Sequence, residues 1–211
     1  MYLPSHHEEK DLSVLHALIQ AHPLGAWVTL DDEGFTANHI PFILDASRGQ
    51  HGTLRAHVAR ANPVWQTLNA AAPSLVIFQG AQTYITPNWY PSKQLNGRVV
   101  PTWNYAVVHA HGTAKIIHDR GWLLQTITDL TNQNESGQPA PWKVADAPAE
   151  FIDRLVGAIV GIEIPITRIV GKWKVSQDEA IADRLGTAEA LARLGDANSL
   201  AMSGLVSSRV N

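Results

Sequence analysis

The chain has 211 residues, of which 45% are hydrophobic and 17% charged, and its formal net charge is −3. This composition is typical of a globular protein built around one main core. The absence of cysteine excludes disulfides, thiolate metal sites and cysteine nucleophiles, so any redox chemistry requires a bound cofactor. Dispersed basic residues give DNA binding no electrostatic support. Because no membrane-length apolar run or signal-peptide pattern is present, we expect a cytoplasmic protein without membrane spans.

The first half of the chain predicts one helix followed by antiparallel strands. Apolar residues at helical spacing predict a helix over residues 10–21. Alternating apolar and polar residues then predict a β-hairpin with strands at 25–30 and 35–44. Further predicted elements are strands at 52–58, 74–80 and 82–86 and a short helix at 64–68.

The second half predicts a functional loop, more strands and several helices. The proline-containing loop 87–101 leads into a long strand at 102–117, and Asp119 is a plausible N-cap for the next helix. A helix around residues 151–159 and strands at 160–164 and 168–175 follow. The tail carries a helical stripe that stops at Gly195. We expect a mainly β, α+β barrel over residues 1–177 with a helical extension over 178–211.

Common catalytic motifs are absent, since neither nucleotide-binding glycine loops, a Gly-x-Ser-x-Gly elbow nor a His-Glu-x-x-His helix occurs. His109 and His111 stand two apart on a predicted strand and would face the same side. No third ligand accompanies them, so no metal site is predicted. The His6-His7 pair is a still weaker signal.

The segment from Trp89 to Trp103 is a candidate ligand site. Aromatic side chains alternate there with hydrogen-bonding residues such as Lys93 and Asn104, as a planar heterocycle would require. Chemistry alone leaves a packing corner as an equal alternative.

Several blocks occur in an order that resembles one known family. They are Met1-Tyr-Leu-Pro, Thr36-Ala-Asn-His-Ile-Pro41, Gly52-Thr-Leu-Arg-Ala-His-Val-Ala-Arg-Ala-Asn-Pro63, Val76-Ile-Phe-Gln-Gly80, Tyr84-Ile-Thr-Pro-Asn-Trp-Tyr90, Val100-Pro-Thr-Trp-Asn-Tyr105, Pro141-Trp142 and Gly171-Lys-Trp-Lys-Val-Ser-Gln177. Together they resemble the PaiB family of FMN-binding negative transcriptional regulators.

This resemblance implies a split β-barrel like that of pyridoxamine-phosphate oxidases, and a homodimer that holds FMN where the subunits meet. The FMN-binding residues it implies are Thr36, Asn38, His39 and Ile40 along the flavin, His57, Arg60 and Asn62 at the phosphate, and Lys93, Thr102, Trp103 and Asn104 from the partner subunit. Arg60 is the natural charge partner of the phosphate. Since neighbouring strand residues point to opposite faces, only one of Asn38 and His39 is expected to touch the flavin.

Three alternatives stay open beside the regulator. One is a flavin-dependent oxidoreductase, another is a haem-handling protein that uses His109 and His111, and the third is a dimer whose barrel is vacant or holds another phosphorylated heterocycle. No catalytic residue is predicted. The acidic pair Asp178-Glu179 replaces the asparagine and basic residue usual in the family, which weakens any anion contact at that corner.

Overall fold

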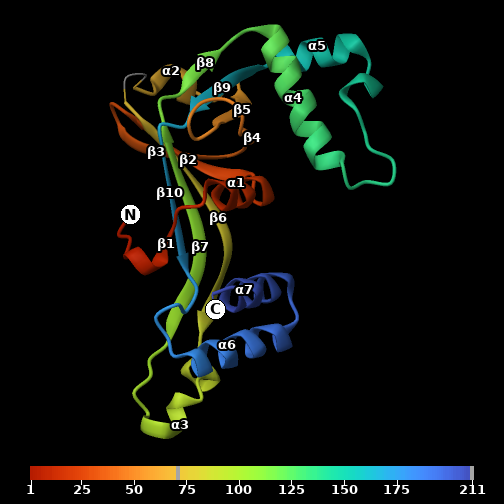
Figure 1. Ribbon diagram of the computed structural model, residues 1–211. Coiled ribbons are helices and arrows are strands. Elements are labelled where there is room, and N and C mark those ends of the chain that lie inside the picture. The colour runs from red at the N-terminus through yellow and green to blue at the C-terminus, as the bar shows by residue number, and fades with distance from the viewer. Residues whose placement is uncertain (70–71, 210–211) are drawn as a thin grey trace. The chain divides into compact units, whose positions relative to one another are not determined.

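The computed structural model describes residues 1–69 and 72–209, which form two compact units (Figure 1). The terminal unit contains residues 1–18, 79–108 and 170–209, and the central unit contains residues 19–69, 72–78 and 109–169. The tail that follows Asp178 belongs to the terminal unit. No helix in the described residues is long and apolar enough to cross a membrane.

The described residues form strands and peripheral helices. The strands are β1 (Glu8–Glu9), β2 (Leu24–Asp31), β3 (Gly34–Pro41), β4 (Ile43–Asp45), β5 (Thr53–Ala59), β6 (Ser74–Ile85), β7 (Thr102–Gly112), β8 (Lys115–Ile117), β9 (Ile159–Pro165) and β10 (Arg168–Lys174). The α-helices are α1 (Leu12–Ala21), α2 (Val64–Thr67), α3 (Ser92–Asn96), α4 (Arg120–Glu135), α5 (Ala149–Gly157), α6 (Ile181–Leu194) and α7 (Ala197–Ser207). The 3-10 turns of the described residues are η1 (Ser5–His7), η2 (Pro87–Trp89) and η3 (Val144–Asp146).

The strands form two hydrogen-bonded sheets. Their orders are β1-β10-β7-β6-β2-β3 and β4-β5-β9-β8. Antiparallel pairing joins β1 to β10, β2 to both β3 and β6, β5 to both β4 and β9, and β8 to β9. Along the chain, β6, β7 and β10 each begin in one unit and end in the other. Antiparallel sheets with surrounding helices confirm the predicted α+β class.

The core of the central unit lies under the β2–β3 hairpin. Trp27 and Phe78 are 0% exposed, and the ring of Phe42 meets that of Phe78 edge-on at 5.8 Å. Gly25 is required beside them, because a Cβ atom there would lie 2.7 Å from Val76 Cγ1. Tight packing therefore fixes one face of the hairpin.

The helices of the central unit pack on each other through their apolar sides. The Asp119 carboxylate accepts a hydrogen bond from the Trp122 amide at 2.8 Å, which confirms the predicted N-cap of α4. Leu123 of α4 and Ile152 and Val156 of α5 form a buried cluster.

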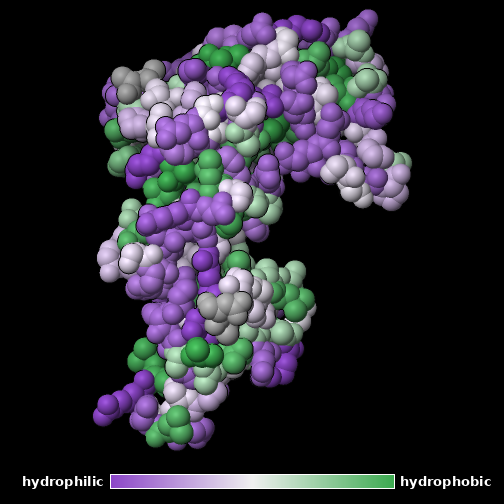
Figure 2. Space-filling view, viewed as in Figure 1, coloured by the Kyte–Doolittle hydropathy of each residue, from purple (hydrophilic) through white to green (hydrophobic). Residues whose placement is uncertain are grey.

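The terminal unit is organised around α6 and α7, which lie side by side (Figure 1). Hydrophobic residues also reach the surface over these helices (Figure 2), and Leu185, Leu194 and Leu200 are among the exposed ones. The buried Asp183 of α6 accepts hydrogen bonds from Ser92 N at 3.0 Å and Ser92 Oγ at 2.6 Å. This carboxylate therefore fastens α3 to α6.

Several predicted boundaries differ from the structure. The strand predicted over 35–44 is divided at Phe42 into β3 and β4, which belong to different sheets, because the buried Phe42 ring packs into the core between them. The strands predicted on either side of Ala81 are one strand, β6, because Gly80 is needed for close packing rather than for a turn: its Cβ would lie 3.1 Å from Leu18 Cδ1. The long strand predicted over 102–117 is divided into β7 and β8 just after Gly112, where a Cβ would lie 2.2 Å from the Pro165 carbonyl oxygen. The tail contains a second helix, α7, that the sequence did not predict.

Candidate functional site

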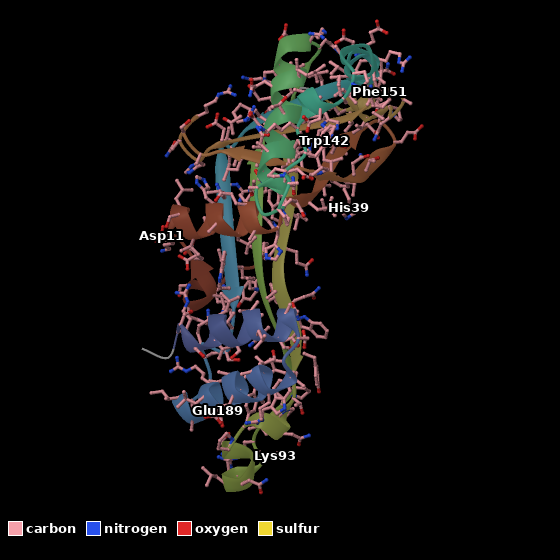
Figure 3. All side chains as sticks on the ribbon, turned by 90° about the vertical axis from the view of Figure 1, so that its right-hand side faces the viewer. Asp11, His39, Lys93, Trp142, Phe151 and Glu189 are labelled. Carbon is pink, nitrogen blue, oxygen red and sulfur yellow. The ribbon has the colours of Figure 1, made fainter. Side chains whose placement is uncertain are left out.

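The register of the hairpin divides the predicted flavin residues between two sheet faces. Asn38 lies opposite Trp27, and the alternation along β3 puts Thr36 and Ile40 on the same face as Asn38. His39 points to the other face and is exposed (Figure 3). Only the Asn38 face is continuous with the packed interior, so Asn38 and His39 have different surroundings.

Two asparagines bring β3 to the segment that follows β5. Asn62 Nδ2 donates to Asn38 Oδ1 at 2.8 Å, and Asn62 Oδ1 accepts from Val64 N at 3.0 Å. Asn38 Nδ2 and His57 Nδ1 are buried side-chain nitrogens without a hydrogen-bond partner in the structure. Burial lowers the pKa of His57, so its imidazole is neutral at pH 7. The central unit therefore holds unpaired polar atoms on two of the predicted residues.

Arg60 follows β5 directly and is held by backbone oxygens. Its Nε donates to the Gly157 carbonyl and its Nη2 to the Ile159 carbonyl, both at 2.9 Å. In turn the Arg60 carbonyl accepts from Trp65 Nε1 at 3.1 Å. Arg60 is exposed, and its guanidinium group is oriented by carbonyl oxygens rather than by a carboxylate of the described residues, so its charge is available to an anion.

A cavity of about 590 Å³ opens beside Asn62 and Thr36. It is lined by the acidic turn Asp31, Asp32 and Glu33, by Thr36 and Asn62, and by residues at the start of α2. Three carboxylates at one wall repel a phosphate. The charges therefore favour an anionic group on the Arg60 side and a neutral, hydroxyl-bearing group in this cavity.

The remaining predicted residues belong to the terminal unit, and the structure assigns several of them internal partners. Lys93 on α3 (Figure 3) donates to Asn88 Oδ1 at 2.5 Å. Lys174 donates to Thr102 Oγ1 and, at 3.1 Å, to the Trp103 carbonyl. Lys174, which was not among the predicted site residues, therefore joins the start of β7 to the end of β10.

Trp103 and Asn104 have opposite environments. The Trp103 side chain is 50% exposed, and its indole nitrogen donates to Gln82 Oε1 at 3.2 Å. Asn104 is 0% exposed, and its Nδ2 donates to Ser176 Oγ at 2.8 Å. Trp103 can therefore meet a ligand, whereas Asn104 supports the turn after β10.

The histidine pair of β7 is arranged beside an arginine. The rings of His109 and His111 lie 6.4 Å apart, and Arg168 Nη2 lies 2.8 Å from His111 Nε2. Burial, with help from His111 and Arg168, lowers the pKa of His109 to about 4. A neighbouring guanidinium disfavours a further cation such as haem iron at His111, so this pair does not favour haem binding.

The residues of the central unit fit FMN. The unpaired donor Asn38 Nδ2 needs an acceptor, which flavin oxygens and nitrogens supply, and Arg60 provides the positive charge that a phosphate needs. Asn62 is already joined to Asn38 and completes the polar group.

This fold recurs in solved structures, and the chain has the split β-barrel fold. The flavocytochrome Anf3 from Azotobacter vinelandii has a TM-score of 0.59 at 11% identity, with 79% of this chain and 69% of that chain covered. The FAD and heme binding protein from Mycobacterium smegmatis has a TM-score of 0.57 at 15% identity, with 79% and 73% covered. At these identities the likeness shows the fold alone, and it confirms the split barrel.

The family follows from the sequence itself. The model of the family described as "Putative FMN-binding domain" matches residues 1–168, so the chain belongs to that family. An uncharacterized protein of Emericella nidulans is 36% identical over 230 residues, with 92% of both chains covered. Protease synthase and sporulation protein PAI 2 of Bacillus subtilis is 26% identical over 210 residues, with 100% of this chain and 98% of that protein covered. The resemblance to the PaiB family is thereby confirmed.

Proposed function

We propose that the protein binds FMN through the polar group of its central unit and works as a regulator of the PaiB type. The observation that carries this proposal is the pair formed by Asn38 and by Asn62, which comes just after Arg60 in the chain. The two side chains are joined at 2.8 Å, and the buried Asn38 Nδ2 has no partner among the described residues. When bound, FMN supplies redox chemistry that a chain without cysteine lacks. The protein supplies orientation, through a hydrogen bond from Asn38 Nδ2 and through the charge of Arg60.

Replacing Arg60 by alanine is expected to weaken FMN binding about 10- to 100-fold, because a hydrogen bond to a charged group contributes about 1.5–3 kcal/mol. Quenching of flavin fluorescence during titration measures the dissociation constant. Riboflavin has no phosphate, so its affinity should be equal for the wild type and Arg60→Ala.

The riboflavin comparison separates a phosphate contact from a structural role, since Arg60 also binds two backbone carbonyls. If Arg60→Ala weakened riboflavin as much as FMN, the arginine would act only by shaping the site. Arg48→Ala is the matched control, because Arg48 is half-exposed but already paired with Glu163 at 2.9 Å. Failure of the wild type to bind FMN at micromolar concentration would disprove the flavin role.

We further propose a homodimer whose interface includes the outer face of the β2–β3 hairpin. On this face Leu24 is 62% exposed, Leu30 40% and Phe35 81%, and Leu30 lies directly opposite Phe35. Large apolar side chains gathered on one sheet face are typical of interaction surfaces. A second copy of this chain would cover them.

Changing Phe35 to glutamate is expected to raise the dimer dissociation constant at least about 10-fold, because it places a charge in an apolar contact. Sedimentation velocity over a concentration series measures it. Phe151→Glu, on the 44% exposed Phe151 of α5 (Figure 3), should leave the association unchanged. A monomeric wild type at high concentration would refute the proposed interface.

The regulatory role is proposed to act through a protein partner rather than by direct DNA contact. The basic residues of α6 are engaged, since Arg184 donates to the Arg209 carbonyl at 2.6 Å and Arg193 pairs with Glu189. The net charge of −3 also opposes non-specific DNA affinity.

Oxidation of a reduced nicotinamide by the FMN-loaded protein would instead favour the flavin-dependent oxidoreductase.

A further inference from the structure

Two histidines and a carboxylate from distant parts of the sequence meet in the terminal unit. His6 and His7 belong to η1, and Asp178 follows the end of β10. Potential ligand atoms of all three lie within 4.8 Å of one another. Among the described residues, this is the one group of three histidine or acidic residues whose potential ligand atoms lie so close together. The sequence predicted no metal site, because nothing local in it connects Asp178 to the histidine pair.

His7 is a buried imidazole with an unused nitrogen. Its side chain belongs to a residue only 4% exposed, and Nδ1 has no hydrogen-bond partner. The side chain of Gln177 acts on the ring and favours its protonated form, which partly offsets the burial that lowers the pKa of His7. A histidine that binds metal through one nitrogen commonly has a polar neighbour that orients the ring. Gln177 is such a neighbour of His7.

The turn that delivers Asp178 is fixed by strained backbone. Ser176 has a φ of 64°, the one positive value among described non-glycine residues, and the side chain of this 2% exposed serine accepts from Asn104. Gln177 is also fixed, since its Oε1 accepts from Val175 N at 2.7 Å. Such strain persists only where the surrounding structure holds it. The hydrogen bonds of Ser176 and Gln177 therefore hold the turn that carries Asp178 in place.

Acidic and basic side chains both act on this corner. Asp178, Glu179 and Asp183 act together on Tyr90, whose pKa is raised to about 12 by burial and by these three carboxylates. Lys172 acts in the opposite direction, but its ammonium group already contacts the Tyr2 carbonyl at 3.2 Å and lies over the Tyr105 ring.

We propose that His6, His7 and Asp178 bind a divalent zinc ion that fastens the N-terminal segment to the turn after β10. Two imidazoles and one carboxylate form a common three-residue zinc ligand set, with the fourth position left to water. Ligand atoms around a tetrahedral zinc ion lie roughly 3.3 Å apart. The separations between the ligand atoms are at most 4.8 Å. Rotation of the exposed side chains of His6 and Asp178 can bring these atoms to the tetrahedral spacing while His7 stays in place.

The test is a titration of untagged, chelator-treated protein with Zn²⁺ by isothermal calorimetry, without added flavin. We expect one site per chain at micromolar or tighter affinity, weakened at least about 10-fold by Asp178→Asn and by His6→Gln. Both changes are at exposed positions and preserve side-chain size, so folding should be maintained. Zinc at about 100-fold excess over the dissociation constant should also raise the Tm of the wild type by roughly 5–10 °C but not that of Asp178→Asn.

Matched controls are His22→Gln, an exposed imidazole, and Glu189→Gln, an exposed carboxylate on α6 (Figure 3), which should bind zinc like the wild type. Equal zinc affinity in the wild type, Asp178→Asn and His6→Gln would overturn the proposal, and so would the absence of a binding signal. Because flavin is omitted, these outcomes do not depend on the proposed FMN site.

Discussion

Replacing Trp27 by alanine is expected to lower the free energy of unfolding by about 3–5 kcal/mol, which is a large share of the stability of an ordinary domain. Trp27 is 0% exposed at the centre of β2, where the side chain packs on the inner face of the hairpin. Removing the indole leaves a cavity that close-packed neighbours cannot fill. Urea denaturation followed by circular dichroism measures the change.

Two further substitutions show whether packing is the cause. Trp27→Phe should cost much less than Trp27→Ala, because it keeps an aromatic ring and removes an indole N–H that has no partner. Trp142→Ala should change stability by less than about 1 kcal/mol, since Trp142 is 45% exposed. Similar losses for Trp142 and Trp27 would contradict a hydrophobic core centred under the hairpin.

The β2–β3 hairpin could be predicted because its information is local. Alternation of side chains and the acidic turn at 31–33 predict the hairpin without reference to the rest of the chain, although the second strand ends at Pro41 and not at residue 44. The same is true of α4, since Asp119 caps the helix three residues before the Trp122 amide that it binds. Short-range physical rules were sufficient in both cases.

Helix α7 was missed although one local signal was present. Asp196 accepts from Ser199 N at 3.0 Å, which is an ordinary N-cap. The helix itself, Ala197–Ser207, contains serines and Gly204 and no charged face, so its periodicity is weak. Contact with α6 stabilises it, as expected when tertiary packing outweighs helix propensity.

The candidate sites differ in the same way. Asn38 and Asn62 stand in two blocks of the family resemblance, and the structure joins them directly. Asp178 was noticed only as a departure from the family pattern, because its approach to His6 and His7 depends on the Ser176 turn and on the pairing of β1 with β10. Contacts that depend on such long-range pairing carry no local sequence signal.

Acidification is expected to destabilise the protein through His109 between pH 6.5 and 4. Burial, the first cause, and the nearby His111 and Arg168 lower the pKa of His109 to about 4, whereas the unfolded chain has the ordinary value of 6.5. Above pH 6.5 both states are neutral and His109 contributes nothing. Below it the unfolded state binds a proton that the native state does not, so stability falls until about pH 4.

The full loss is about 2–3 kcal/mol, allowing for partial solvent exposure of the ring. His109→Gln removes this titration, so the difference in unfolding free energy between the variant and the wild type should grow as the pH falls from 6.5 to 4. His39→Gln, on the exposed face of β3, should follow the wild-type profile. Since His57 and His111 remain in His109→Gln, some acid sensitivity should persist. Parallel profiles for His109→Gln and the wild type would show that His109 is protonated as readily in the native state as in the unfolded chain.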